Sequence, residues 1–297
     1  HEKAPKPEEF RSDDCEWFFN AVPCYVAETG NFDFYNKVVP YADGGEATVY
    51  GHLRRALEFN LERMGADGLP CGLLADWNDC LKLGYHGESL FVAFQLRLGL
   101  TTYADISKRL GKDDEAKWAL EQRETLDANI QKKCWDGKWF IWAIAEDGTV
   151  YGTQSIEEGQ IYFNTQVWAV LSSAATAEQA RICMESVKEK LATPYGLMLC
   201  APPFVKTRSD IMSSVVFLPG IKENAGIFNH TQGWGIIAET MLGNGDRAYE
   251  YCKAAIPAAY NDKAEIRQSE PYVVGQTTYS TFSKRPGHTR VSWLSGA

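Results

Sequence analysis

The sequence contains no hydrophobic run that approaches the ~20 apolar residues needed to cross a bilayer, so no membrane span is expected. Its eight cysteines form no Cys-x-x-Cys pair, and no Cys/His cluster has the spacing of a zinc site. A secreted disulfide framework would be denser in a shorter chain, so we expect buried thiols and a cytoplasmic protein. Glycine-rich nucleotide loops, HExxH, GxSxG and EF-hand patterns are also missing, and no cofactor or metal is expected.

An excess of positive charge is missing as well. The chain has 30 Lys and Arg against 39 Asp and Glu, a net charge of −9, which gives no reason to expect a nucleic-acid partner. The 45% hydrophobic and 23% charged content is that of a globular protein. The nine tryptophans are many, and their rings suit both a core and the C–H faces of sugars.

Apolar residues recur at helical spacing along most of the chain. We expect helices over 13–28 (broken or bent at Pro23), 46–64, 88–110, 113–133, 165–175, 177–191, 232–242 and 246–260. Asp-Gly pairs at 136–137 and 147–148 predict a short hairpin, and the last forty residues read as loop. Helices in consecutive pairs with few strands predict an all-α toroid of helical hairpins, with the long loops at one end carrying the site.

The segment Ala75–Cys80 places two carboxylates and an indole within four positions of a loop. A carboxyl beside an aromatic wall loses solvation, so its pKa rises and it can act as a general acid. The alternative is a turn in which Asp and Asn cap backbone N–H groups. Asp76 or Asp79 could cap the turn while the other does chemistry.

The segment Gly220–Gln232 gathers Lys222, Glu223, Asn224 and His230 between glycines, directly before an expected helix. Such side chains suit hydrogen bonding to sugar hydroxyls, and the N-terminus of the helix favours an anion near His230. A well-capped surface loop is the alternative. Two weaker signals are Glu270–Gln276 and Ser295-Gly296, whose amides could hold an oxyanion. The acids Glu157 and Glu158 read as a solvated pair.

Taken together, four segments resemble the disaccharide phosphorylases of glycoside hydrolase family 94: Ala75-Asp76-Trp77-Asn78-Asp79-Cys80, Gly220–Gln232, Glu270-Pro271-Tyr272 with Gln276, and Ser292-Trp293-Leu294-Ser295-Gly296. The resemblance implies an (α/α)6-barrel catalytic domain over residues 1–297. Because both ends look cut, we expect an incomplete barrel with a short β-hairpin insertion. The family's N-terminal β-sandwich, helical linker and upstream phosphate-binding and sugar-binding residues have no counterpart in the chain.

The resemblance also implies roles for individual residues. Asp79 matches the general acid. The sugar-binding positions are Trp77, Asn78, Lys222, Glu223 and Gln276, and the phosphate pocket is His230, Ser295 and Gly296. The implied partners are a disaccharide and inorganic phosphate, and the resemblance also implies a homodimer.

The implied reaction is inverting phosphorolysis of a β-1,4-linked disaccharide to an α-sugar 1-phosphate, with N,N′-diacetylchitobiose favoured over cellobiose. An inverting hydrolase needs an acid and a base, but phosphate is already a charged nucleophile, so Asp79 alone suffices. Two alternatives stay open. A water-using hydrolase would recruit Glu223 or Glu158 as its base, and an inactive domain would only bind sugar.

Overall fold

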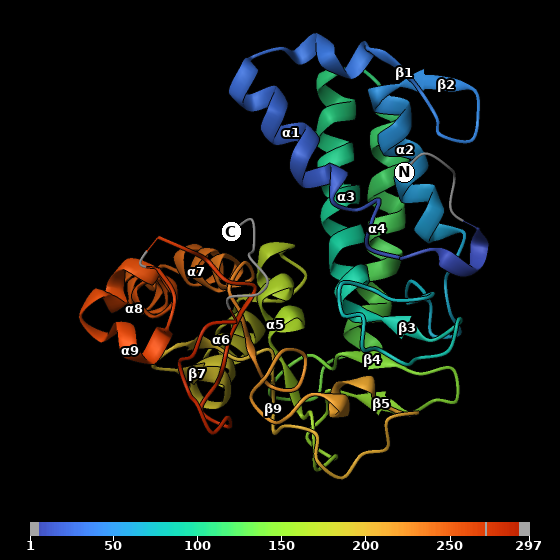
Figure 1. Cartoon of the computed structure of the whole chain (residues 1–297). Coiled ribbons are helices and arrows are strands. Elements are labelled where there is room, and N and C mark those ends of the chain that lie inside the picture. The colour runs from blue at the N-terminus through green and yellow to red at the C-terminus, as the bar shows by residue number, and fades with distance from the viewer. Residues whose placement is uncertain (1–5, 271, 291–297) are drawn as a thin grey trace. The chain divides into compact units, whose positions relative to one another are not determined.

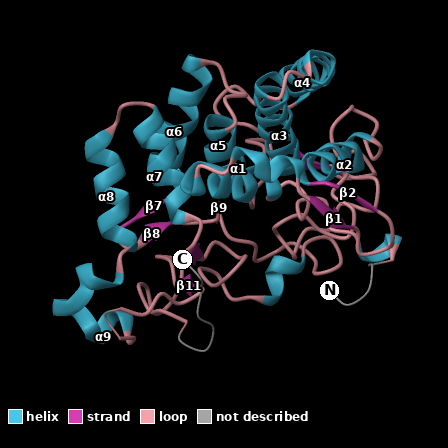
Figure 2. Ribbon diagram, turned by 90° about the horizontal axis from the view of Figure 1, so that it is seen from above, coloured by secondary structure: helices cyan, strands magenta, loops and turns pink. Residues whose placement is uncertain are grey.

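The computed structural model describes residues 6–270 and 272–290. The chain divides into two compact units. Unit 1 comprises His1–Asp79, Leu83–Cys134 and Ala143–Thr149, and unit 2 comprises Cys80–Lys82, Trp135–Trp142 and Val150–Ala297. Most of the regular structure in the described part of the chain is helical, and its strands are two or three residues long (Figure 2).

Unit 1 is built on antiparallel helices. Its elements are η1 (Pro7–Glu9), α1 (Phe18–Thr29), η2 (Phe32–Asn36), β1 (Val38–Pro40), β2 (Glu46–Thr48), α2 (Val49–Leu61), β3 (Glu88–Ser89), α3 (Leu90–Arg109), α4 (Asp113–Lys133) and β4 (Ala143–Ile144). Helices α3 and α4 form a long hairpin (Figure 1). Helix α3 is buried on nearly every side through its first half, so its sequence is apolar around the whole helix.

Unit 2 also consists of helical hairpins, joined by longer loops. Its elements are β5 (Val150–Tyr151), β6 (Ile161–Tyr162), α5 (Phe163–Leu171), α6 (Ala177–Leu191), β7 (Ala192–Thr193), β8 (Gly196–Leu197), β9 (Cys200–Ala201), η3 (Ser213–Val216), β10 (Ile227–Phe228), α7 (Gln232–Met241), α8 (Gly245–Ala255), η4 (Pro257–Lys263), α9 (Ala264–Arg267) and β11 (Thr277–Thr278). Helices α7 and α8 pack against each other, and α5 contacts both α6 and α7.

The starts and ends of the helices follow local chemistry. Helix α2 begins at Val49 because Glu46–Thr48 pairs with β1 and the Thr48 hydroxyl accepts a hydrogen bond from Gly51 N at 3.0 Å. Ser89 caps α3 in the same way. The α4 bounds agree with the expected range to the residue.

Four expected helices were wrong by three or more residues at an end, and the one expected to reach residue 175 ends at Leu171. The helix expected from residue 46 begins only after β2. The helix expected from residue 13 begins at Phe18, because Asp13 accepts a hydrogen bond from the Trp17 indole and closes a turn instead. The helix expected to reach residue 260 ends at Ala255, because Pro257 cannot donate a helical hydrogen bond and starts η4.

Two expectations from composition can be compared with the structure. All eight cysteines lie within the described residues and none is bonded to another. Five are buried as expected, but Cys24 is exposed and Cys15 and Cys252 are half-buried. Across the described ranges, no helix is both long and apolar enough to cross a membrane.

Candidate functional site

The loop after α2 holds the first group of predicted site residues, in unit 1. A short strand-like contact fixes it: Leu74 N donates to Phe10 O at 3.1 Å, and Ser12 N donates to Ala75 O at 3.1 Å. Residues 10–12 therefore position the loop that carries Asp76–Asp79.

Asp76 is the capping residue of this loop. It is 1% exposed, and its carboxylate accepts from Asn78 N at 2.6 Å and from the Ser89 hydroxyl at 2.7 Å. Burial raises the pKa of Asp76 to about 7, against the opposing effect of the two hydrogen bonds. The contacts link the loop to the N-terminus of α3, so Asp76 takes the turn-capping role that the sequence left open between the two aspartates.

Asp79 has a different environment. Its side chain is 66% exposed and forms an ion pair with Arg11, 68 residues earlier in the chain. The hydrogen bond to Asp79 raises the pKa of the Arg11 guanidinium. The burial expected of the general acid is found at Asp76, whereas Asp79 is exposed. Trp77 is half-buried and Asn78 is buried beside them.

A strained turn in unit 2 presents Lys222 and Glu223. Lys222 and Ala225 both have positive φ, at 48° and 61°, which is costly for residues other than glycine. Gly220 N donates to Asn224 O at 2.8 Å and Gly226 N to Lys222 O at 2.9 Å. Non-glycine strain of this kind clusters at functional sites, where the surrounding structure enforces it.

Asn224 is the residue that enforces this turn. It is fully buried, and its amide pairs with both backbone groups of Phe204, at 2.7 and 2.8 Å, and donates to Phe217 O at 2.8 Å. The turn is thereby tied to both ends of the loop 204–217. Within the turn, the Glu223 side chain is buried, with 8% of its surface exposed. The Lys222 ammonium lies 5.3 Å from the centroid of the Phe217 ring.

We expect Asn224→Ala to loosen this turn without unfolding the protein. Three hydrogen bonds of about 1 kcal/mol each are lost, so stability should fall by about 2–3 kcal/mol. Amide hydrogen exchange should accelerate in residues 204–226 and stay unchanged in α3 and α4. Uniform acceleration throughout the chain would contradict the local role of Asn224.

His230 and Gln276 are brought together by strand pairing. β10 and β11 are antiparallel, with Phe228 opposite Thr277, so Asn229 N donates to Gln276 O at 3.0 Å. The Asn229 side chain also donates to Gly275 O at 2.7 Å. The Gln276 Oε1 atom is buried and has no hydrogen-bond partner among the described residues, which leaves an acceptor for a ligand.

The His230 ring is half-buried, two residues before α7 begins at Gln232. It lies edge-on to Phe228 and Trp234, with centroid distances of 5.9 and 6.4 Å. Burial lowers the pKa of His230, which favours the neutral imidazole near pH 7. A neutral imidazole beside a helix N-terminus can donate one N–H to an anion.

The remaining predictions stand as follows. Ser295, Gly296 and the motif residues Pro271 and Ser292–Leu294 lie outside the described residues. Glu158 is not a solvated acid, because its carboxylate accepts from the backbone N–H groups of Val205, Lys206 and Thr207. No group of three or more potential metal ligands is found among residues 6–270 and 272–290. No sequence signal points to Arg11, whose partner Asp79 lies 68 residues away. Asn224 belongs to the polar segment expected to bind sugar hydroxyls, but its amide holds the turn through Phe204 and Phe217.

Comparison with known proteins identifies the family. Residues 2–297 match the Glycosyl hydrolase 94 superfamily, catalytic domain. The chain is similar to N,N′-diacetylchitobiose phosphorylases of Vibrio proteolyticus (40% identical) and Vibrio furnissii (37%), each over 96% of the chain and 36% of the relative. A solabiose phosphorylase of Paenibacillus borealis is 30% identical over 96% of the chain and 38% of its own length.

Solved structures add the fold. A rhamnosidase from Klebsiella oxytoca with rhamnose bound aligns with 94% of the chain, with a TM-score of 0.58 and 14% identity, and the chain covers 44% of that structure. A family 78 rhamnosidase from Bacillus also aligns with 94% of the chain, with a TM-score of 0.60 and 15% identity, and the chain covers 24% of it. The expected all-α, (α/α)6-barrel class is confirmed. The chain spans about a third of the length of the phosphorylases it matches, and it belongs to the catalytic domain of the glycosyl hydrolase 94 superfamily.

Proposed function

We propose that the protein cleaves N,N′-diacetylchitobiose by inverting phosphorolysis, giving N-acetylglucosamine and its α-1-phosphate. The observation that carries the proposal is the 40% identity to a chitobiose phosphorylase over nearly the whole chain. The unit 2 geometry adds support, because the β10–β11 pairing assembles His230 and Gln276 and the neighbouring strained turn presents Lys222 and Glu223.

In the proposed mechanism Asp79 gives its proton to the glycosidic oxygen as the bond to the anomeric carbon breaks. Phosphate attacks that carbon from the opposite face, so the configuration inverts and no protein base is needed. Trp77 and Asn78 take one part of the disaccharide, and Lys222, Glu223 and Gln276 bind hydroxyl groups. His230, with Ser295 and Gly296, holds phosphate.

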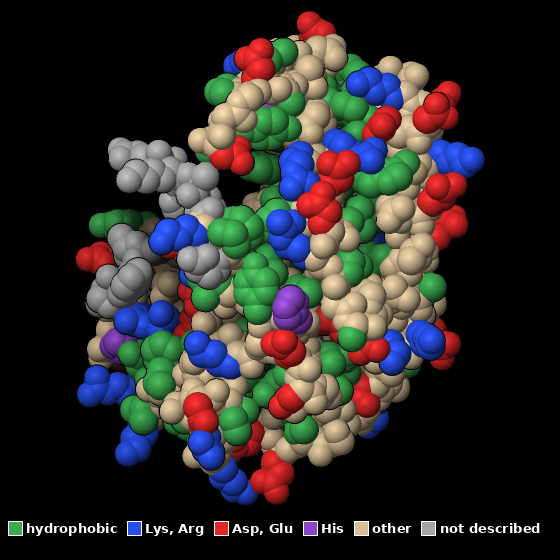
Figure 3. Space-filling view, turned by 90° about the vertical axis from the view of Figure 1, so that its right-hand side faces the viewer, with side chains coloured by type: hydrophobic (Ala, Val, Ile, Leu, Met, Phe, Trp, Pro, Cys, Tyr) green, Lys and Arg blue, Asp and Glu red, His purple; other side chains and the backbone are tan. Residues whose placement is uncertain are grey.

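The arrangement requires phosphate to be concentrated locally. Acidic and basic side chains are interspersed over the face in Figure 3, which supports a substrate held by a local pocket rather than a polyanion held by a basic surface. We accordingly propose that no nucleic acid binds. We propose separately that the enzyme works in the cytoplasm, from its unpaired cysteines, and that it forms a homodimer, from its resemblance to the family. We also propose that residues 1–297 make up the major part of one (α/α)6 domain in a longer enzyme.

The full-length protein should cleave N,N′-diacetylchitobiose only when phosphate is added, and mass spectrometry should detect the sugar 1-phosphate. The His230→Ala variant should raise the KM for phosphate by about tenfold or more, since one hydrogen bond to a charged group is worth about 1.5–3 kcal/mol. The KM for the disaccharide should change little.

Three outcomes would redirect the proposal. Cleavage without phosphate would favour the hydrolase, and faster phosphorolysis of cellobiose would move the substrate to glucosyl sugars. Binding of the disaccharide with no turnover in either buffer would leave a sugar-binding domain.

A further inference from the structure

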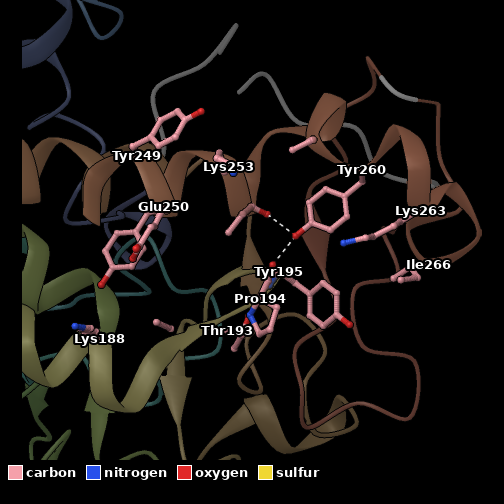
Figure 4. A pocket seen from close by; sticks show the side chains of 14 residues that line it. Lys188, Thr193, Pro194, Tyr195, Tyr249, Glu250, Lys253, Tyr260, Lys263 and Ile266 are labelled. Atoms are coloured by element: carbon pink, nitrogen blue, oxygen red, sulfur yellow. Dashed lines mark hydrogen bonds between the residues drawn. The ribbon is translucent and has the colours of Figure 1, made fainter. Parts of the chain in front are cut away.

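A pocket lies in unit 2. It has a volume of about 750 Å³ and is formed by the end of α6, the turn between β7 and β8, helix α8, and η4 with α9 (Figure 4). This volume lies in the range of about 300–1,000 Å³ that is typical of small-molecule sites. Neither Lys222, Glu223, His230 nor Gln276 is among its lining residues.

The charge around this pocket is positive, although the chain as a whole carries −9. Three lysines line it, Lys188, Lys253 and Lys263, against the single acid Glu250. The net charge of the chain would repel an anion, but the local excess of lysines along this pocket attracts one.

A buried arginine behind the wall adds to the positive charge. Arg267 is 2% exposed, and its Nε and Nη2 atoms have no hydrogen-bond partner within the described ranges. Its guanidinium lies 5.4 Å from the ring centroid of Tyr260, which lines the pocket. Buried guanidinium groups are normally paired with an acid, because an unpaired buried charge costs several kcal/mol. An anion bound in the pocket would offset part of that cost.

Tyrosine rings form much of the remaining wall. Tyr195 and Tyr260 lie next to each other with centroids 6.4 Å apart, and Tyr249, on α8, is 65% exposed (Figure 4). The Tyr260 hydroxyl is fixed by the carbonyl oxygens of Pro194 and Ala254, at 2.5 and 3.1 Å. Tyr251 also lines the pocket, and its buried hydroxyl has no hydrogen-bond partner in the described part of the chain.

We propose that this pocket binds a phosphorylated monosaccharide. The lysines would neutralise the phosphate dianion, and the tyrosine faces would pack against the C–H surface of the sugar ring. A neutral sugar would leave the positive charge uncompensated, and a bare phosphate would leave the rings uncovered. The proposal is independent of the proposed function, since none of its residues takes part in phosphorolysis.

Calorimetric titration of the full-length protein with glucose 6-phosphate tests the proposal. We expect glucose 6-phosphate to bind at least tenfold more tightly than glucose or inorganic phosphate, with affinity falling as salt is added. The double variant Lys253→Ala/Lys263→Ala should weaken binding at least tenfold, and Tyr249→Ala several-fold. The matched control Lys138→Ala/Lys284→Ala removes the same charge from exposed positions of unit 2 and should leave binding unchanged.

The His230→Ala variant separates this pocket from the proposed phosphate site and should bind glucose 6-phosphate normally. The proposal is overturned if native protein gives no binding, or if binding survives the double lysine variant but is lost with His230→Ala. Equal affinity for inorganic phosphate together with no effect of Tyr249→Ala would also overturn it, because the sugar would then have no role. Disaccharide phosphorolysis by the double lysine variant should stay at the native rate, so this test and that of the proposed function fail separately.

Discussion

Replacing Asp79 with asparagine in the full-length protein is expected to lower kcat for phosphorolysis by about 10²–10⁴-fold, the usual contribution of a general acid. Asparagine keeps the size of the side chain and can no longer give a proton to the leaving oxygen. Disaccharide binding, measured by calorimetry, should change little. Because Asp79 is 66% exposed, thermal stability should also stay near that of the native protein.

The leaving group provides an independent check on this role. A nitrophenyl glycoside releases an oxygen that needs no protonation, so Asp79→Asn should impair its phosphorolysis far less than that of the disaccharide. The matched control is Asp14→Asn, an exposed acid nearby in unit 1, which should leave both rates unchanged. Near-native turnover of the disaccharide by Asp79→Asn would remove Asp79 from the mechanism and make Asp76 the next acid to test.

In the proposed mechanism the ion pair between Arg11 and Asp79 opens before Asp79 gives its proton to the leaving oxygen. An exposed pair of this kind is worth at most about 1 kcal/mol, so substrate binding can break it. In the proposed mechanism the disaccharide displaces the guanidinium and excludes water from the Asp79 carboxyl. Asp76 is thus the buried aspartate that holds the loop in place, and Asp79 is the aspartate that solvent and ligands can reach.

Local sequence signals sufficed for the long helices, because the α3–α4 hairpin follows from apolar spacing. The preference of aspartate for turns predicted a capping turn as one alternative, but it left open which of Asp76 and Asp79 forms the cap. Contacts between distant segments could not be predicted from such signals. The Arg11–Asp79 pair spans 68 residues, and the contact of Asn229 with Gln276 depends on a two-residue strand pairing that has no periodicity to detect.

The second large effect is expected at Glu16, and it concerns the stability of the protein rather than its catalysis. Its side chain is 1% exposed in unit 1, and its Oε1 atom accepts from Asn60 Nδ2 at 2.7 Å. Its Oε2 atom, packed near Gly99 and Phe19, has no hydrogen-bond partner in the described residues. Burial raises the pKa of Glu16 to about 8, from an ordinary value of 4.5.

The consequence is a stability that falls as pH rises. Between pH 4.5 and 8 the native carboxyl keeps its proton while the unfolded one ionises, so the unfolded state gains about 1.4 kcal/mol per pH unit. Below that window Glu16 does not change the stability with pH, and above it the loss is complete, on the order of 5 kcal/mol. Asp13 and Asp76, with raised pKa values of about 6 and 7, act in the same direction at lower pH.

Glu16→Gln should remove the Glu16 share of this dependence, because the amide oxygen can still accept from Asn60 and never ionises. The free energy of unfolding can be measured in urea at pH values from 5.5 to 8.5, with amide exchange in α1–α3 as the probe. The variant should become more stable than the native protein as pH rises. The exposed control Glu124→Gln on α4 should run parallel to the native protein. If the Glu16→Gln curve also runs parallel, the buried carboxyl is ionised throughout, and a cation or water must hold its second oxygen.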